Sequence, residues 1–600
     1  MNPRNGTFKP IGVILALVLL LPLAGCVVEW PIAKEVYTTA EQQVVPVPVP
    51  AGTEEIGPAE VSRYAELGYG AWEVAPGTNY SLDAGNPRPY DKRVELAPGH
   101  TDVTSAARLL SFFTVSDVHL SDKESPAMLT YAGSSAGYGA NIALETYYTP
   151  AALATTQVLD AAIQTVNALH KKTPFDFGIS LGDEANATQH NELRWFIDVL
   201  DGKVITPSSG AHLGAATIDY QKPFKAAGLD KAIPWYQAIG NHDQFWLGGY
   251  ENDKSLQAHI GNTVFNMSMD DTLSMLERVN TTGYYMGVVD GTTPYGDIIK
   301  AGPEEDFAVP PTVAADENRR SLATATSPTL NGMREFFNTT SKPVGHGFTQ
   351  ANLDADFACY SFEPKSDLPL KVIVLDDTWK KANSQQEGDS PPDYAAGYLD
   401  PTRKAWLKSE LDEGQNSSKL MIIAAHIPLL PQWSITDSET IDKDYQVLND
   451  SELLSELHSY PNLILWIAGH RHVNVVTPQP YDPTVATQGP ENSFWEVETC
   501  SLRDFPQQFR TFDIRRNTDN TISIFVTNVT PAVREGSPAA KSRAYAIGAF
   551  EIFATYPFSV PYGHFSDPID PPSQSYNAEL VKVLTPEMQV VIANCGTPLE

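Results

Sequence analysis

Residues 463–472 read Leu-Ile-Leu-Trp-Ile-Ala-Gly-His-Arg-His, an apolar run followed at once by a glycine and two histidines one residue apart. The apolar run predicts a strand that is buried on both faces. In open α/β sheets, ligands bind just beyond the carboxyl ends of the strands. His470 and His472 therefore occupy a position that is typical of a functional site.

The same order, an apolar run and then a polar motif, recurs along the chain. Buried strands are predicted at 109–115, 175–181 and 420–425, with a weaker one at 233–239 and another at 372–375. The motifs that follow these runs are Asp117-Val118-His119, Gly182-Asp183, Gly240-Asn241-His242-Asp243 and His426. Apolar residues at helical spacing separate the strands, at 158–169, 401–414 and 453–457, which predicts a layered α/β core. Five polar motifs at strand ends are expected to converge on one rim.

In their order and spacing these motifs resemble the calcineurin-like metallophosphoesterase superfamily, over roughly residues 108–515. The resemblance implies a four-layer αββα sandwich and a pair of metal ions. By motif, Asp117, His119 and His472 would bind the first ion, Asn241, His426 and His470 the second, and Asp183 would bridge the two. His242 matches the histidine of the family that is not a ligand, and Asp243 beside it is a candidate to orient that imidazole.

The chemistry expected of such a site is hydrolysis of a phosphomonoester or phosphodiester. Imidazole and carboxylate ligands suit Mn, Fe, Zn or Ni. Two ions sharing a carboxylate activate a hydroxide for in-line attack and neutralise the phosphoryl oxygens. His242 would stabilise the transition state or protonate the leaving oxygen as a general acid. The sequence leaves open whether the substrate is a monoester or a diester, and which metals bind.

Departures from known subfamilies narrow the resemblance. The arginines that clamp phosphate in protein Ser/Thr phosphatases are absent, because Asn186 and Ala187 follow the Gly-Asp motif and Ile239 precedes Gly240. His119 and Asn186 also differ from the purple acid phosphatase pattern, so no tyrosinate ligand is expected. What remains resembles a diverse bacterial branch of hydrolases. Arg471 and Arg503 are open to two interpretations, contact with substrate phosphate or a surface salt bridge.

The N-terminus resembles that of a bacterial lipoprotein. Arg4 and Lys9 precede an apolar run over 11–23 that is too short to span a bilayer comfortably, and Leu-Ala-Gly-Cys ends at Cys26. This pattern predicts a signal peptide over 1–25, lipidation of Cys26 and an extracytoplasmic, lipid-anchored protein in the periplasm or at the cell surface. The alternative is an ordinary signal peptide with an incidental cysteine.

The remaining segments have distinct compositions. Residues 26–107 are rich in proline, which predicts an extended tether, and the phosphoesterase domain is expected at 108–530. Within it, residues about 244–350 are predicted to be an insertion overhanging the site. Residues 531–600 form a C-terminal extension expected to be rich in strands. Cys359, Cys500 and Cys595 permit one disulfide, with the pairing left open.

The formal net charge of −32 disfavours nucleic acid as a partner, whereas a small phosphate ester remains possible where local metal charge overrides the global field. One alternative function is a surface-anchored binding protein with a retained but non-catalytic metal site. A metallopeptidase is disfavoured because the chain contains no HExxH motif. Oligomeric state is not readable from the sequence.

Overall fold

The structure is a computed structural model. It describes residues 27–57, 60–77, 89–125, 150–209, 221–249, 265–266, 284–289, 298–303, 308, 312–313, 316–322, 330–379, 396–429, 446–448, 451–554 and 577–599. The predicted signal peptide at 1–25 and Cys26 lie outside these residues. Among the described helices, none combines the length and the apolar character that crossing a membrane requires.

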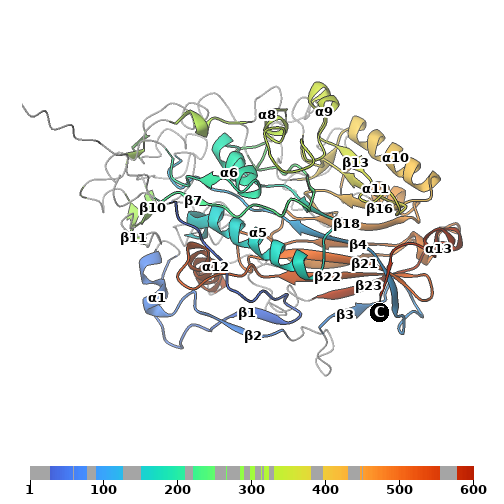
Figure 1. The fold of residues 1–600 in the computed structure, drawn as a ribbon, viewed down its shortest axis with the longest axis horizontal. Coiled ribbons are helices and arrows are strands. Elements are labelled where there is room, and N and C mark those ends of the chain that lie inside the picture. Colours follow the sequence, from blue (N-terminus) through green and yellow to red (C-terminus); the bar gives the residue numbers. More distant parts are fainter. Residues whose placement is uncertain are drawn as a thin grey trace, which may run out of the picture.

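Two sheets form the centre of the molecule (Figure 1). In the larger one, β4 (Ser105–Val115), β5 (Phe177–Ser180) and β8 (Trp235–Gln237) run parallel, and β4 pairs antiparallel with β21 (Phe509–Asn517). The sheet continues through β22 (Ile522–Val529), β23 (Ala578–Lys582) and β3 (Asp91–Arg93), and β24 (Thr597–Pro598) pairs with β4.

The smaller sheet has the order β13-β14-β16-β18-β20-β19. Its parallel centre consists of β14 (Leu370–Val374), β16 (Leu420–Ala424), β18 (Leu463–Ala468) and β20 (Phe494–Glu498). The antiparallel edges are β13 (Tyr360–Phe362) and β19 (Val475–Gln479). Parallel neighbours bring the carboxyl ends of β14, β16 and β18 to one edge.

Alternating side chains build the layers of the core. In β16, Ile422 and Ala424 pack in the cluster between the sheets, whereas Met421 and Ile423 pack in the cluster against the helices α10 (Pro401–Asn416) and α11 (Ser451–Leu457). This is the period-two pattern of a strand buried on both faces. The two sheets face each other, because Phe362 of β13 packs edge-to-face against Phe177 of β5, with ring centroids 5.4 Å apart.

The outer face of the larger sheet is covered by α5 (Thr155–Lys172) and α6 (His190–Leu200), whose apolar residues belong to the same core cluster. Phe196 of α6 packs against Trp235 of β8, with ring centroids 5.8 Å apart. The order of layers is therefore helix, sheet, sheet, helix, which confirms the predicted four-layer αββα sandwich.

The predicted tether is wrong for the described part of residues 26–107. This part forms β1 (Gln42–Pro46), η1 (Val61–Arg63), α1 (Tyr64–Leu67), β2 (Trp72–Pro76) and β3. Ile56, Val61 and Tyr64 are buried in a cluster with Leu153 and Ile552, and Val36 and Leu96 belong to the main core. These apolar residues outweigh the preference of the prolines for an isolated extended chain, because their burial needs the rest of the molecule.

The C-terminal extension at 531–600 is mixed rather than rich in strands. It contains α12 (Pro538–Ala554) and α13 (Pro586–Ile592), while β23 and β24 complete the larger sheet. The alanines of α12 are strong helix formers, which explains the difference. The boundary predicted at 530 therefore crosses a sheet. Among the described residues, Cys359, Cys500 and Cys595 form no disulfide with one another.

The predicted insertion at about 244–350 is described in pieces. β9 (Phe265–Asn266) pairs with β12 (Thr312–Val313), and β10 (Tyr284–Val289) pairs with β11 (Ile298–Pro303). After η4 (Glu317–Arg319), Leu322 N donates to Thr188 O at 2.8 Å, beside the loop that follows β5. This piece of the insertion thus packs against a loop of the candidate site. The helices α8 (Leu330–Glu335) and α9 (Gln350–Ala355) precede β13.

Smaller paired strands and short helices complete the description. β6 (Val204–Ile205) pairs with β7 (Phe224–Lys225), and β15 (Tyr398–Leu399) pairs with β17 (Gln446–Val447). The short 3-10 helices η2 (Pro150–Ala154) and η7 (Pro490–Asn492) precede α5 and β20.

Candidate metal centre

The five sequence motifs stand at the carboxyl ends of five parallel strands, three from the larger sheet and two from the smaller. Asp117 follows β4, Asp183 follows β5 and Asn241 follows β8, whereas His426 follows β16 and His470 follows β18. The structure brings all seven predicted ligands together. Two groups of side chains are able to hold a metal ion, Asp117 with His119 and His472, and Asp183 with His426 and His470. A third group, His119 with Asp183 and His242, overlaps both.

Left-handed backbone presents several of these side chains. Asp117, His119, Asp183, His470 and His472 all have φ between 44° and 70°. Such angles are uncommon outside glycine, although Asp and His tolerate them better than most residues, and they cluster at functional sites. The strained turns directly after the strands thus present five of the seven predicted ligands to the site.

One glycine permits the closest approach of two motifs. A Cβ added to Gly240 would lie 2.8 Å from the carboxyl carbon of Asp183, a distance that real Cβ atoms essentially never show. The Gly-Asp loop and the Gly-Asn-His-Asp loop therefore need glycine at this position to share the site.

The first group of ligand residues contains a carboxylate oxygen, Oδ1 of Asp117, that accepts no hydrogen bond from the described residues. Oδ2 of Asp117 accepts from Ser116 Oγ at 2.6 Å and from His470 N at 2.9 Å, but Oδ1 has no hydrogen-bond partner among the described residues. This Oδ1 lies 3.3 Å from His472 Nε2 and 3.7 Å from His119 Nε2. A buried carboxylate oxygen beside two imidazole nitrogens fits a cation, because burying it alone is costly.

The second group contains two acceptors that face each other. Asn241 Nδ2 donates to Gly248 O at 2.9 Å, which turns its Oδ1 toward His426 Nε2, 2.9 Å away. His426 Nδ1 donates to Leu181 O at 2.9 Å, so the neutral imidazole presents the lone pair of Nε2 to that oxygen. A positive charge is needed between two lone pairs at this distance, and either a metal ion or a proton on Nε2 supplies it.

His470 completes this second group. Its Nδ1 lies 3.1 Å from Asn241 Oδ1 and 3.3 Å from His426 Nε2. Three ligand atoms of different motifs thus point to a common centre, with nitrogen and oxygen donors that suit first-row metal ions.

Asp183 lies between the two groups. Its Oδ2 is 3.2 Å from His426 Nε2 and 3.7 Å from His119 Nε2, and its Oδ1 accepts from His242 N at 2.8 Å. The carboxylate is almost fully buried, with 2% of its side chain exposed. It therefore contacts one histidine from each group, as a bridging ligand must.

Electrostatics show how strongly the site attracts positive charge. Burial lowers the pKa of His426, but the nearby carboxylates, Asp183 foremost, together have the larger, opposite effect, and the pKa rises to about 10. Burial likewise lowers the pKa of His472, whereas Asp117 and Asp504 raise it to about 9. The carboxylates thus outweigh the cost of placing a cation in the protein interior.

His242 is held differently from the ligand histidines. Its Nδ1 donates to the backbone oxygen of Asn186 at 2.7 Å, and its ring packs edge-to-face on His119 with centroids 4.4 Å apart. The carbonyl only accepts, so it fixes the proton on Nδ1 and leaves Nε2 available for proton transfer.

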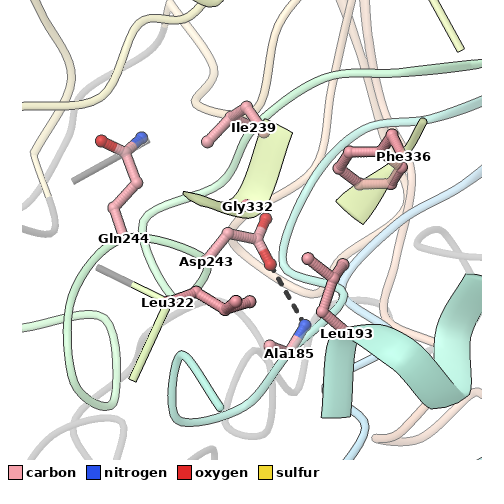
Figure 2. A pocket seen from close by; sticks show the side chains of 8 residues that line it. All are labelled: Ala185, Leu193, Ile239, Asp243, Gln244, Leu322, Gly332 and Phe336. Carbon is pink, nitrogen blue, oxygen red and sulfur yellow. Dashed lines mark hydrogen bonds between the residues drawn. The ribbon is translucent and has the colours of Figure 1, made fainter. Parts of the chain in front are cut away.

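Asp243 has backbone partners rather than the imidazole of His242. Its two oxygens accept from the amides of Asp183, Glu184, Ala185 and Gly240, at 2.9 to 3.1 Å. Figure 2 shows the bond to Ala185 beside a cavity of about 10 Å³, room for about one water molecule. Asp243 thus stabilises the Gly-Asp loop, and the carbonyl of Asn186 is the group that orients His242.

Two arginines of the candidate set are engaged in ion pairs. Arg471 donates through Nε to Glu498 at 2.6 Å, and the fully buried Arg503 pairs with Asp504 at 3.2 Å. Both arginines thus form salt bridges, but that of Arg503 is buried and is not the surface salt bridge considered from the sequence. Asp504 and Asn186 were not predicted as site residues, because no strand-end motif marks them and their role depends on contacts between distant loops.

Comparison with known proteins found likenesses among solved structures. No family model matches the chain, and no curated protein matches it. Among solved structures, the chain is similar to a dimetal phosphatase from Danio rerio, at 12% identity over 71% of this chain and 100% of that chain, with a TM-score of 0.33.

Two further structures are similarly distant. A putative 5'-nucleotidase from Staphylococcus aureus shares 10% identity over 72% of this chain and 58% of that chain, with a TM-score of 0.27. PhoD shares 10% identity over 75% and 78% of the two chains, with a TM-score of 0.28. Likenesses this distant carry no argument about function, which therefore rests on the side chains of the site.

Proposed function

We propose that this chain hydrolyses phosphate esters with two metal ions held between its sheets. The observation that carries the proposal is the position of Asp183, whose Oδ2 contacts His119 of one ligand group and His426 of the other. A carboxylate between two sets of nitrogen and oxygen donors is the arrangement that a dinuclear centre requires.

Seven side chains are proposed to hold the two ions. Asp117, His119 and His472 would bind one, Asn241, His426 and His470 the other, and Asp183 both. When bound, such ions supply Lewis acidity toward phosphoryl oxygens and lower the pKa of a water molecule. Mn, Fe, Zn and Ni all match the donor set.

His242 is proposed to act as the general acid. With Nδ1 fixed on the carbonyl of Asn186, a protonated His242 has its second N–H on Nε2, on the edge facing away from that carbonyl. Donation of this proton to the leaving oxygen would avoid expelling an alkoxide. Its side chain is largely buried, and burial lowers its pKa, which favours release of the proton.

The proposed place of action is outside the cytoplasm, on a lipid anchor at Cys26. The basic start, the short apolar run and the Leu-Ala-Gly-Cys sequence support this proposal. Expression in a bacterial host tests it: the wild type is expected in the membrane fraction and Cys26→Ser in the soluble extracytoplasmic fraction. Equal partition of the two proteins contradicts lipid anchoring.

The decisive experiment compares hydrolysis by stripped and metal-loaded protein. Chelator-treated protein is reloaded with Mn²⁺, Zn²⁺ or Fe²⁺ and given p-nitrophenyl phosphate and bis-p-nitrophenyl phosphate in parallel. We expect release of p-nitrophenol only after reloading, and the ratio of the two rates distinguishes a monoesterase from a diesterase. Tight binding of two ions without turnover of either substrate would instead support a binding protein with a non-catalytic site.

A further inference from the structure

Three polar residues lie behind the histidines of the site and belong to none of the predicted ligand sets. Asn186 is in the loop after β5, whereas Arg503 and Asp504 follow β20. The first two are 0% exposed and Asp504 is 7% exposed. Buried polar groups of this kind are retained only where they are well bonded, so their partners indicate what they do.

Asp504 fixes the orientation of His472. Its Oδ2 accepts from His472 Nδ1 at 2.7 Å, which leaves the Nε2 lone pair of the imidazole facing Asp117 Oδ1, 3.3 Å away. A carboxylate hydrogen-bonded to a ligand histidine sets the tautomer of the imidazole and makes the imidazole a stronger ligand. Loss of such a carboxylate typically weakens metal binding by about 10- to 100-fold.

Asn186 fixes His242 through its main chain and is itself fixed through its side chain. The backbone oxygen accepts from His242 Nδ1 at 2.7 Å, and Oδ1 accepts from Arg503 Nη1 at 2.7 Å. The position of the carbonyl that orients the proposed general acid therefore depends on Arg503.

Arg503 connects these two sets of contacts, the Asp504 arm that holds His472 and the Asn186 arm that holds His242. Its Nε and Nη2 donate to Asp504 at 3.3 and 3.2 Å, while Nη1 holds Asn186. The planar guanidinium presents donors in a rigid fork, which a lysine ammonium lacks. Because the side chain is 0% exposed, it is enclosed by protein rather than open to a substrate in solution.

We propose that Arg503 is a positioning residue that fixes the ligand His472 and the acid His242 relative to each other, through Asp504 and Asn186. This inference rests on the proposed phosphoesterase function. It assigns each arm a separate effect: the Asp504 arm acts on metal affinity and the Asn186 arm acts on proton transfer.

Two measurements separate the arms. Co²⁺ titration of the stripped protein, followed by visible absorption, reports metal affinity without catalysis, and steady-state kinetics reports kcat and KM. Asp504→Asn is expected to weaken one of two Co²⁺ binding steps about 10- to 100-fold. Asn186→Ala keeps the backbone carbonyl but loses its anchor, so kcat is expected to fall by up to about 100-fold with both Co²⁺ steps and KM unchanged.

Arg503→Met is expected both to weaken one Co²⁺ binding step and to lower kcat. Arg503→Lys is expected to recover part of one of these two losses. Lys582→Met is the matched control, because Lys582 is also a fully buried basic residue but donates to Pro461 O, before the amino end of β18. It is expected to keep both Co²⁺ steps and the wild-type kcat.

The proposal is overturned if Arg503→Met retains both Co²⁺ steps and wild-type kcat. If that variant does not fold, Asp504→Asn and Asn186→Ala decide, and absence of the split between metal affinity and kcat overturns it equally. A wild-type protein that does not bind two Co²⁺ ions or hydrolyse either ester refutes the proposed function itself, a result that the variants do not produce.

Discussion

Asp183 and His242 are adjacent in space but have different expected functions. The Asp183 carboxylate contacts histidines of both ligand groups, whereas the backbone amide of His242 donates to Asp183 and its ring directs Nδ1 to Asn186. The proton on Nδ1 of His242 is held by the carbonyl of Asn186, whereas Oδ2 of Asp183 has no such backbone partner among the described residues. The first residue should therefore be needed to hold the ions, and the second to move a proton.

Substitution of these two residues separates metal binding from chemistry. Asp183→Ala is expected to lose paired metal binding and to abolish turnover. His242→Ala should retain two ions but lose about 10²- to 10⁴-fold in kcat, the usual contribution of a general acid. Metal content by elemental analysis, combined with p-nitrophenol release, checks both expectations. Unchanged two-ion occupancy in Asp183→Ala would show that this carboxylate does not bridge.

At the scale of elements, the parts predicted correctly are those with a local pattern. β16 and β18 are continuous apolar runs, and the ligands follow them within a few residues, so both strand and motif are readable from short windows. The orienting groups of His242 and His472 come from other loops, after β5 and β20. No local pattern encodes these contacts, because they exist only once the two sheets have packed.

The N-terminal region shows the opposite error, in which a local pattern was misleading. The prolines of 46–50 favour an extended chain, but Val49 packs on the buried cluster of Ile56, Val61 and Tyr64. Tertiary burial outweighed local propensity, because apolar side chains scattered among prolines still gain by leaving water.

The segment 316–322 is anchored to the site by a buried ion pair. Arg319 is 0% exposed and donates to Asp122 Oδ2 at 3.0 Å, while Arg320 O accepts from His190 N at 3.0 Å. Arg319→Met leaves a buried carboxylate without its cation, which we expect to lower the free energy of unfolding by about 3–5 kcal/mol.

Urea unfolding checks this loss of stability, and hydrogen exchange should show faster exchange at residues 186–190 in Arg319→Met. The adjacent Arg320→Met is the matched control, since Arg320 is exposed and its substitution should change neither quantity. Equal stability of the two variants would mean that the Asp122 ion pair does not anchor the segment.

At the scale of the whole molecule, metal binding should be visible as stability. Ions that bind only the folded state stabilise it by about 2.7 kcal/mol at a free concentration of 100 times Kd. Chelation is therefore expected to lower the Tm of the wild type, and Asp183→Ala should show little response to the same treatment. A wild-type Tm that is identical with and without chelator would exclude tight metal binding to the folded chain.

The stability of the whole fold should also depend on pH through Lys582. This lysine is fully buried on β23 and donates to Pro461 O at 3.4 Å and to Glu491 O, and burial lowers its pKa from 10.5 to about 7. Between these two pKa values the unfolded chain binds more protons than the folded one, so the free energy of unfolding rises with pH, by at most about 1.4 kcal/mol per unit. The gain in stability begins near pH 7 and is complete only above pH 10.5.

Urea unfolding of the wild type and of Lys582→Met at pH 6.5, 8 and 9 measures this gain. The difference between the two free energies of unfolding isolates Lys582, because the other titrating groups are common to both proteins. We expect the wild type to gain stability relative to the variant at each step; a difference that stays constant over this range would mean that Lys582 remains charged in the folded protein.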